Sequence, residues 1–155
     1  MEERTLVAYI SAGGATERYA HIIADTLRSR GYVVDAVDLK RDRVPDLSSY
    51  ENAVVGTGVR IGMVYRKGKQ FLRRKDLKGK RLAIFLSSGV AIKSAEKSKA
   101  MFLQPLVEKY SLDPVMCDAF PGKIPGSRGK LEDRTDPEIA RLWAEELASR
   151  LSEPV

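Results

Sequence analysis

Hydroxyl and glycine residues that could bind an anion cluster near the amino terminus, in the segment from Ser11 to Thr16. The segment follows an apolar run at residues 6–10 and precedes apolar residues at helical spacing. A strand, a short loop and a helix in this order direct loop amides and the first N–H groups of the helix at one point, where the helix dipole adds partial positive charge. The two hydroxyl residues could donate to the same anion, and Gly13 and Gly14 would let the backbone approach it. The segment predicts a phosphate site, although a tight strand-to-helix turn without a ligand would use the same residues.

The elements that must position this segment alternate along the chain. Gly31 follows a basic last turn and ends the first helix, and Asp136 caps the last helix ahead of Pro137. The alternation predicts an α/β fold in which one parallel sheet has helices on both faces, within a single domain spanning residues 1–155. Strands are expected at about residues 4–10, 32–39, 52–57, 81–87 and 113–120, and helices at about 15–30, 64–74, 94–110 and from 136 onward.

Two further loops should lie beside the first. In open α/β sheets, ligands bind beyond the carboxyl ends of the strands, where the strand order reverses. The loops after the first, third and fourth strands, at residues 11–16, 57–62 and 87–91, should therefore converge. All three contain glycine and lack acidic side chains, which suits a flat anionic ligand lying against the backbone. Glycine is also common in the loops of any α/β protein, so an ordinary structural interpretation stands beside the functional one.

The composition excludes several classes of protein. A chain of 155 residues with 43% hydrophobic and 31% charged residues is typical of a soluble globular domain. No apolar run approaches the roughly 18–20 residues that cross a membrane, and no signal peptide is recognisable. A single cysteine, Cys117, excludes an internal disulfide and a cysteine-rich metal site and indicates a reducing cytoplasm. The lone His21 is a poor metal ligand, so no metal site is predicted.

Basic residues dominate one stretch of a chain whose net charge is +6. Between Arg60 and Arg81 there are ten lysines or arginines and one acid, Asp76. Such a run usually forms a solvated helix face, and it could also attract an anionic membrane surface or an acidic partner. Since no aromatic interleaving or nucleic-acid motif accompanies it, nucleic acid is not expected as a partner.

The chain resembles flavodoxin-like domains. Its first loop is similar to their Ser/Thr-x-x-Gly-x-Thr phosphate loop at Ser11, Gly14 and Thr16. The resemblance implies a three-layer α/β sandwich with a five-stranded parallel sheet in the order 2-1-3-4-5, and FMN as the cofactor. It also implies that the phosphate of FMN binds the first loop and that the isoalloxazine ring lies between the other two. The residues so implied in cofactor binding are Ser11, Ala12, Gly13, Gly14, Ala15, Thr16, Thr57, Gly58, Val59, Arg60, Ile61, Gly62, Ser87, Ser88, Gly89, Val90 and Ala91.

Within this superfamily, the second loop is most similar to that of the menaquinone-dependent protoporphyrinogen dehydrogenases. These read Gly-Ala-Ser-Ile-Arg-Tyr-Gly where residues 56–62 read Gly-Thr-Gly-Val-Arg-Ile-Gly. Residues 90–93, Val-Ala-Ile-Lys, resemble that branch after the fourth strand, and residues 122–125 resemble it weakly after the fifth. The resemblance implies an FMN-dependent oxidoreductase acting on protoporphyrinogen or linked to a quinone.

The chain departs from flavodoxins at positions that contact FMN. Gly13 stands where threonine is frequent and Ala15 where asparagine is usual, so two polar contacts to the phosphate are missing. Neither ring-flanking loop offers the tryptophan and tyrosine of electron-carrier flavodoxins, and Tyr65 lies further along the chain. We therefore expect a modest affinity for FMN.

The segment after the fifth strand, residues 121–135, is expected to be a long loop without regular structure. Loops of about 12–15 residues or more are frequently lids or binding segments. Lys123, Arg128 and Lys130 could meet the carboxylates of a substrate or an acidic redox partner. A mobile surface loop is the alternative interpretation.

Three function classes remain open from the sequence. The first is an FMN-dependent oxidoreductase acting on a planar acidic substrate or a quinone, with no catalytic residue identified because the cofactor supplies the chemistry. The second is a flavodoxin-type electron carrier for an acidic protein partner, and the third is a non-redox binding module on the same scaffold. A cytoplasmic location is expected, with peripheral contact to anionic membrane as an option. The oligomeric state is open, with a homodimer as one option.

Overall fold

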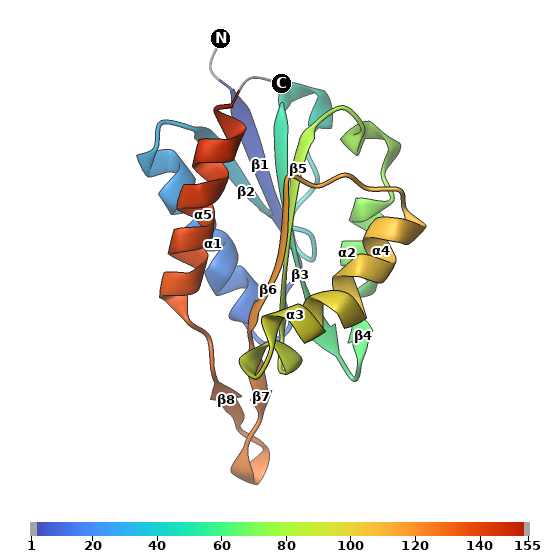
Figure 1. Cartoon of the computed structure of the whole chain (residues 1–155), viewed down its shortest axis with the longest axis vertical. Helices are drawn as coiled ribbons and strands as arrows, with labels where there is room; N and C mark the ends of the chain where they lie inside the picture. Colours follow the sequence, from blue (N-terminus) through green and yellow to red (C-terminus); the bar gives the residue numbers. More distant parts are fainter. Residues whose placement is uncertain (1–2, 154–155) are drawn as a thin grey trace.

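A parallel sheet runs through the centre of the protein, which we describe from a computed structural model for residues 3–153 (Figure 1). Five parallel strands follow one another in the order β2-β1-β3-β5-β6. Counted along the chain without the small strand β4, this is the order 2-1-3-4-5, so the predicted fold class and strand order are confirmed. The bounds are Arg4–Tyr9 for β1, Val33–Asp38 for β2, Asn52–Arg60 for β3, Arg81–Ser88 for β5 and Met116–Pro121 for β6.

Alternate residues of the central strands build two separate apolar layers, because successive side chains of a strand point to opposite faces of the sheet. In β1, Val7 and Tyr9 belong to one buried cluster, whereas Leu6 and Ala8 belong to the other. The burial of consecutive residues is typical of a parallel strand covered on both faces.

Helices α1 (Ala15–Ser29) and α5 (Pro137–Leu151) cover the first face of the sheet and pack against each other (Figure 1). Gly31 adopts a φ of 94° just beyond α1, as its predicted role at the helix end requires. The Asp136 side chain accepts a hydrogen bond of 3.1 Å from the Glu138 amide, so the predicted cap of α5 is confirmed. Among residues 3–153, no helix has both the length and the apolar character needed to span a bilayer.

Shorter helices cover the second face: α2 (Arg66–Leu72), α3 (Ala95–Ser98) and α4 (Gln104–Lys109). The single helix expected over residues 94–110 is divided, since a π-helical turn, η4 (Lys99–Leu103), separates α3 from α4. Pro105 has no N–H to donate to the carbonyl of Met101, which interrupts the regular helical hydrogen bonds at this point.

The third strand is longer than expected and turns back on itself. It reaches Arg60, and β4 (Met63–Val64) pairs with it in the antiparallel direction. The turn consists of Ile61 and Gly62, whose φ angles of 51° and 72° are both positive, as in type I′ hairpins. Helix α2 therefore begins at Arg66 rather than near Val64.

The expectation of an irregular loop over residues 121–135 is wrong. This segment forms a two-stranded antiparallel hairpin of β7 (Lys123–Pro125) and β8 (Leu131–Asp133), joined through the 3-10 turn η5 (Ser127–Gly129). The Gly122 amide donates to the Ser88 carbonyl at 3.0 Å and so joins the base of the hairpin to β5. The hairpin extends beyond the carboxyl ends of the central strands (Figure 1).

Three further 3-10 turns lie in the connections: η1 (Leu47–Ser49) before β3, η2 (Lys75–Leu77) before β5 and η3 (Val90–Ile92) after β5. The last of these belongs to the third of the three predicted site loops and influences the site described below.

Candidate functional site

A cavity of about 570 Å³ lies at the carboxyl ends of the central strands. The three predicted loops converge there, and the β7–β8 hairpin closes one side. The volume of this cavity lies in the range of ordinary ligand pockets. The lining residues are Ser11, Ala12, Gly13, Ala15, Thr16, Gly58, Val59, Arg60, Ile61, Tyr65, Ser87, Ser88, Gly89, Gly122, Lys123, Pro125 and Leu131.

The first loop presents backbone N–H groups to the cavity. Gly14 precedes α1 with a φ of 93°, a conformation that glycine adopts without strain. Within residues 3–153, the amides of Ala15, Thr16 and Glu17 have no hydrogen-bond partner, as is usual for the first turn of a helix. The Gly14 amide donates to the Ser11 hydroxyl at 3.0 Å, so this amide is not free for a ligand. The Ser11 hydroxyl still has its own hydrogen to donate.

The Thr16 hydroxyl, which was expected to donate to the anion, forms hydrogen bonds within the protein instead. It donates to the Thr57 carbonyl at 3.1 Å and lies 2.7 Å from the Ser87 hydroxyl. Thr16 is buried, and these contacts join the end of the first site loop to the starts of the second and third. Its hydroxyl is thus an internal connection, and only its backbone N–H remains for an anion.

The second loop is divided between the cavity and the core. The segment from Gly58 to Ile61 lines the cavity, whereas Thr57 is fully buried and Gly62 lies in the turn of the β3–β4 hairpin. The Thr57 hydroxyl has no hydrogen-bond partner in the described part of the chain. A β-carbon placed on Gly68 of α2 would lie 2.5 Å from that hydroxyl, so Gly68 makes room for the Thr57 side chain, which faces α2 rather than the cavity.

The third loop contributes its first three residues, Ser87 to Gly89. The Ser88 hydroxyl lies 2.6 Å from the Ser98 hydroxyl and accepts from the Ala91 amide at 3.1 Å. These contacts fold the chain into η3, so Val90 and the buried Ala91 are not part of the cavity wall, in contrast to the expectation.

Sequence reasoning missed the contribution of Tyr65. A β-carbon on Gly58 would lie 2.8 Å from Cε2 of Tyr65, so the Tyr65 ring packs against the backbone of Gly58 in space that a side chain there would occupy. Tyr65 returns to the cavity because β4 folds back along β3, and the Ile61–Gly62 turn was the available signal for that hairpin. Burial raises the pKa of the Tyr65 phenol, while the charge of Arg60 acts in the opposite direction.

Hairpin residues also line the site, among them Lys123, which the sequence suggested only as a contact for substrate or partner carboxylates, and Leu131, which it did not suggest. Lys123 and Leu131 lie against the first loop, because β-carbons on Gly14 and Gly13 would approach Lys123 Nζ to 3.2 Å and Leu131 Cδ1 to 3.3 Å. The cavity lining includes Arg60 and Lys123 but no aspartate or glutamate among the described residues. The site is therefore electropositive.

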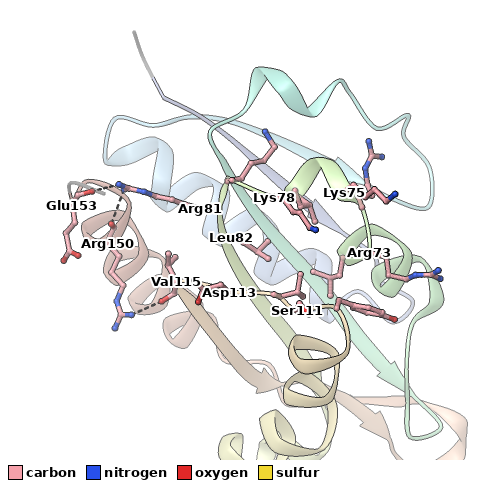
Figure 2. A pocket seen from close by; sticks show the side chains of 17 residues that line it. Arg73, Lys75, Lys78, Arg81, Leu82, Ser111, Asp113, Val115, Arg150 and Glu153 are labelled. Atoms are coloured by element: carbon pink, nitrogen blue, oxygen red, sulfur yellow. Dashed lines mark hydrogen bonds between the residues drawn. The ribbon is translucent and has the colours of Figure 1, made fainter.

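A larger cavity, of about 800 Å³, lies at the opposite end of the sheet, around the start of β5 (Figure 2). Several of its cations have structural partners: Arg81 donates to the Glu153 carbonyl at 2.6 Å, and Arg150 donates to the Val115 carbonyl at 2.9 Å (Figure 2). Lys80 likewise donates to the carbonyls of Leu47 and Tyr50. These groups join α5 and the loops to the sheet. The cavity lies at the amino ends of the strands, whereas ligands of such sheets bind at the carboxyl ends.

The groups that line the cavity at the carboxyl ends of the strands suit a flavin nucleotide. Free amides at the start of α1, the Ser11 hydroxyl and Lys123 suit an anionic phosphate. Glycines at positions 58 and 89 keep side chains out of the second and third loops, and Tyr65 and Val59 offer apolar surface to a flat ring.

Comparisons with known proteins agree with this geometry. The profile of the flavodoxin domain family matches residues 6–137. The fold is similar to flavodoxin 1 from Bacillus cereus, with a TM-score of 0.69 and 18% identity over 97% of this chain and 100% of that one. It is similar to a flavodoxin from the domain Archaea, with a TM-score of 0.65 and 18% identity over 97% and 99% of the two chains.

Rubredoxin oxygen:oxidoreductase from Desulfovibrio gigas is also similar, with a TM-score of 0.66 and 17% identity over 97% of this chain and 37% of that one. No curated protein sequence matches the chain. None of these findings supports the protoporphyrinogen dehydrogenase branch in particular. Because the family profile covers most of the chain and the fold agrees with it, the chain belongs to the flavodoxin domain family, whose members are FMN-binding flavoproteins.

Proposed function

We propose that the chain is an FMN-dependent oxidoreductase that carries out two-electron chemistry in the cavity at the carboxyl ends of β1, β3 and β5. The observation that carries this proposal is the convergence of the three glycine-bearing loops, with Arg60 and Lys123 in the lining and no carboxylate there. Bound FMN would supply the transfer of electrons or hydride. The protein would bind, orient and electrostatically tune it.

Each part of the cavity has a role in this proposal. The amides of Ala15 to Glu17 and the Ser11 hydroxyl bind the phosphate. Tyr65 and Val59 contact the ring, and the exposed guanidinium of Arg60 stabilises negative charge that develops near it. A positive potential at the cavity also favours an anionic substrate.

The substrate class is a planar acidic molecule or a quinone. Protoporphyrinogen is the specific candidate, and its support is the similarity of residues 56–62 and 90–93 to the dehydrogenase branch. Turnover of protoporphyrinogen with a quinone acceptor by the FMN-loaded protein tests this assignment, with a redox-inactive flavin analogue as the control. Failure to oxidise the porphyrinogen, combined with two-electron reduction of simple quinones by the dithionite-reduced FMN-loaded protein, would retain the oxidoreductase and reject the substrate.

An electron carrier is the second candidate, because two apolar side chains are exposed on the β3–β4 hairpin, one of which, Ile61, lines the cavity. Ile61 is 91% and Met63 is 65% exposed on the β3–β4 hairpin, as a surface that docks a protein partner would be. A redox titration separates the two candidates. Reduction in one two-electron step supports the oxidoreductase, and two well-separated one-electron steps support the carrier.

The binding step is tested with FMN and riboflavin, which differ by the phosphate. We expect Ser11→Ala to weaken FMN by about tenfold, as loss of a hydrogen bond to a charged group does, and to leave riboflavin unchanged. Ser29→Ala at the opposite end of α1 is the matched control, since its hydroxyl only donates to the Thr26 carbonyl. If wild-type protein binds neither flavin, the proposed function is wrong.

A further inference from the structure

The β7–β8 hairpin places an ammonium group against the first loop. A β-carbon on Gly14 would lie 3.2 Å from Lys123 Nζ, and one on Gly13 would lie 3.9 Å from Lys123 Cδ. Lys123 is half-buried and lines the same cavity wall as Ser11 and Thr16. The side chain therefore lies across the two glycines, with its charged end at the start of α1.

The charge of Lys123 has no direct partner. Within the described part of the chain, its ammonium forms neither a hydrogen bond nor an ion pair. Its neighbour across the hairpin is Asp133, but that carboxylate accepts from the Thr135 hydroxyl at 2.5 Å and lies 3.6 Å from Arg18 Nη1. Hydrogen bonds from Thr135 and, after them, the charge of Lys123 lower the pKa of the Asp133 carboxyl, but Lys123 and Asp133 form no ion pair within the described residues, so the Lys123 ammonium keeps its hydrogens for a ligand.

We propose that Lys123 is a phosphate-binding residue that reaches the first loop from the hairpin and takes the place of polar side chains that this loop lacks. Gly13 and Ala15 carry no polar atoms, so the loop itself offers an anion only backbone amides and one free hydroxyl. Gly14 is needed for its φ of 93°, and a β-carbon at either glycine would crowd the end of Lys123 or Leu131 by a few tenths of an ångström. The inference rests on the proposed function, since it assumes that a flavin phosphate occupies this end of the cavity.

The hairpin packs on both sides of the cavity mouth, which fixes where Lys123 lies. A β-carbon on Gly89 of the third loop would lie 2.8 Å from Ile124 Cγ2, and Leu131 lies against Gly13 of the first loop. The hairpin thereby bridges the first and third loops with its apolar residues while Lys123 contributes the charge.

The test compares the dissociation constants of FMN and riboflavin for purified full-length protein, measured by flavin fluorescence. We expect Lys123→Met, which keeps the length of the stem, to weaken FMN by about 10- to 100-fold, the range for a charge-assisted hydrogen bond, and to leave riboflavin within about twofold. Lys130→Met, in the same hairpin but exposed and outside the cavity lining, is the matched control and should change neither constant. Raising the salt concentration should weaken FMN less in Lys123→Met than in the wild type.

Each outcome has a distinct meaning. Equal losses of FMN and riboflavin in Lys123→Met would show that the residue acts through the hairpin packing, and the inference would be overturned. Unchanged FMN binding would also overturn it while leaving the proposed function intact, because the wild type would still bind FMN. Retention of FMN affinity by Lys123→Arg, with an unchanged thermal midpoint of the cofactor-free variants, would support the charge as the cause.

Discussion

Replacement of Thr16 by valine tests whether its hydroxyl belongs to the protein interior or to the binding site. Valine keeps the shape and β-branching of threonine and replaces the hydroxyl with a methyl group of similar size. In the structure that hydroxyl contacts the Thr57 carbonyl and the Ser87 hydroxyl, and both Thr16 and Ser87 are buried. The substitution therefore leaves two buried polar groups without a partner that they have in the wild type.

The expected magnitude follows from these two contacts. The Ser87 hydroxyl is left unsatisfied, at a cost of about 1–3 kcal/mol, and the Thr57 carbonyl, which lies in the β3–β5 ladder, loses a further hydrogen bond worth about 1 kcal/mol, so a loss of about 3 kcal/mol in the free energy of unfolding is predicted. For a domain of this size, that loss lowers the thermal midpoint by about 6–12 °C. The assay is urea unfolding of the cofactor-free protein, together with the FMN dissociation constant of the folded variant.

Thr26→Val is the matched control, because it makes the same substitution in the same helix. The Thr26 hydroxyl donates only to the Ile22 carbonyl of its own helix, at 2.7 Å, and a change within about 0.5 kcal/mol is expected. If Thr16→Val leaves stability unchanged and abolishes FMN binding, the hydroxyl points to the ligand and the reasoning is refuted. A double-mutant cycle with Ser87→Ala should give a coupling energy of about 1 kcal/mol.

Three further predictions follow from other contacts. Gly56→Ala should prevent stable folding, because its β-carbon would lie 2.1 Å from Cζ of the buried Phe85; circular dichroism and the yield of monodisperse protein check this. Arg60→Gln should lower the midpoint potential of bound FMN by tens of millivolts, since a cation in the cavity lining is removed; a spectroelectrochemical titration measures it, and an unchanged potential would exclude a role for Arg60 in tuning. Burial raises the pKa of the Cys117 thiol to about 11, and burial followed by the charge of Glu17 raises the pKa of Tyr9 to about 12. The folded state therefore binds more protons than the unfolded state above about pH 9, so the free energy of unfolding should fall from about pH 9 to 12. Cys117→Ala should remove the fall between about pH 9 and 10 and reduce it up to about pH 11, because Tyr9 contributes only above its unfolded pKa of about 10.

Much of the fold was predictable because its signals are local. The apolar runs that became β1, β3 and β5 have the small and β-branched residues of strands buried on both faces, and Asp136 and Gly31 act at helix ends through contacts within a few residues. The convergence of the three loops follows from the parallel arrangement, which brings the carboxyl ends of the strands to one edge. The elements that were missed, β4 and the β7–β8 hairpin, have only two or three residues in each strand, too few for a periodic pattern.

Local patterns and the geometry of a parallel sheet were therefore sufficient to predict that the loops at residues 11–16, 57–62 and 87–91 meet at one edge, and most of their residues line the cavity. Only the tertiary structure decided which groups in the cavity are free. The Thr16 hydroxyl is taken by partners 41 and 71 residues away, and Lys123 reaches Gly14 from a hairpin more than a hundred residues further along the chain. Contacts of this kind depend on side-chain packing between distant strands and loops, which leaves no periodic signal in the sequence.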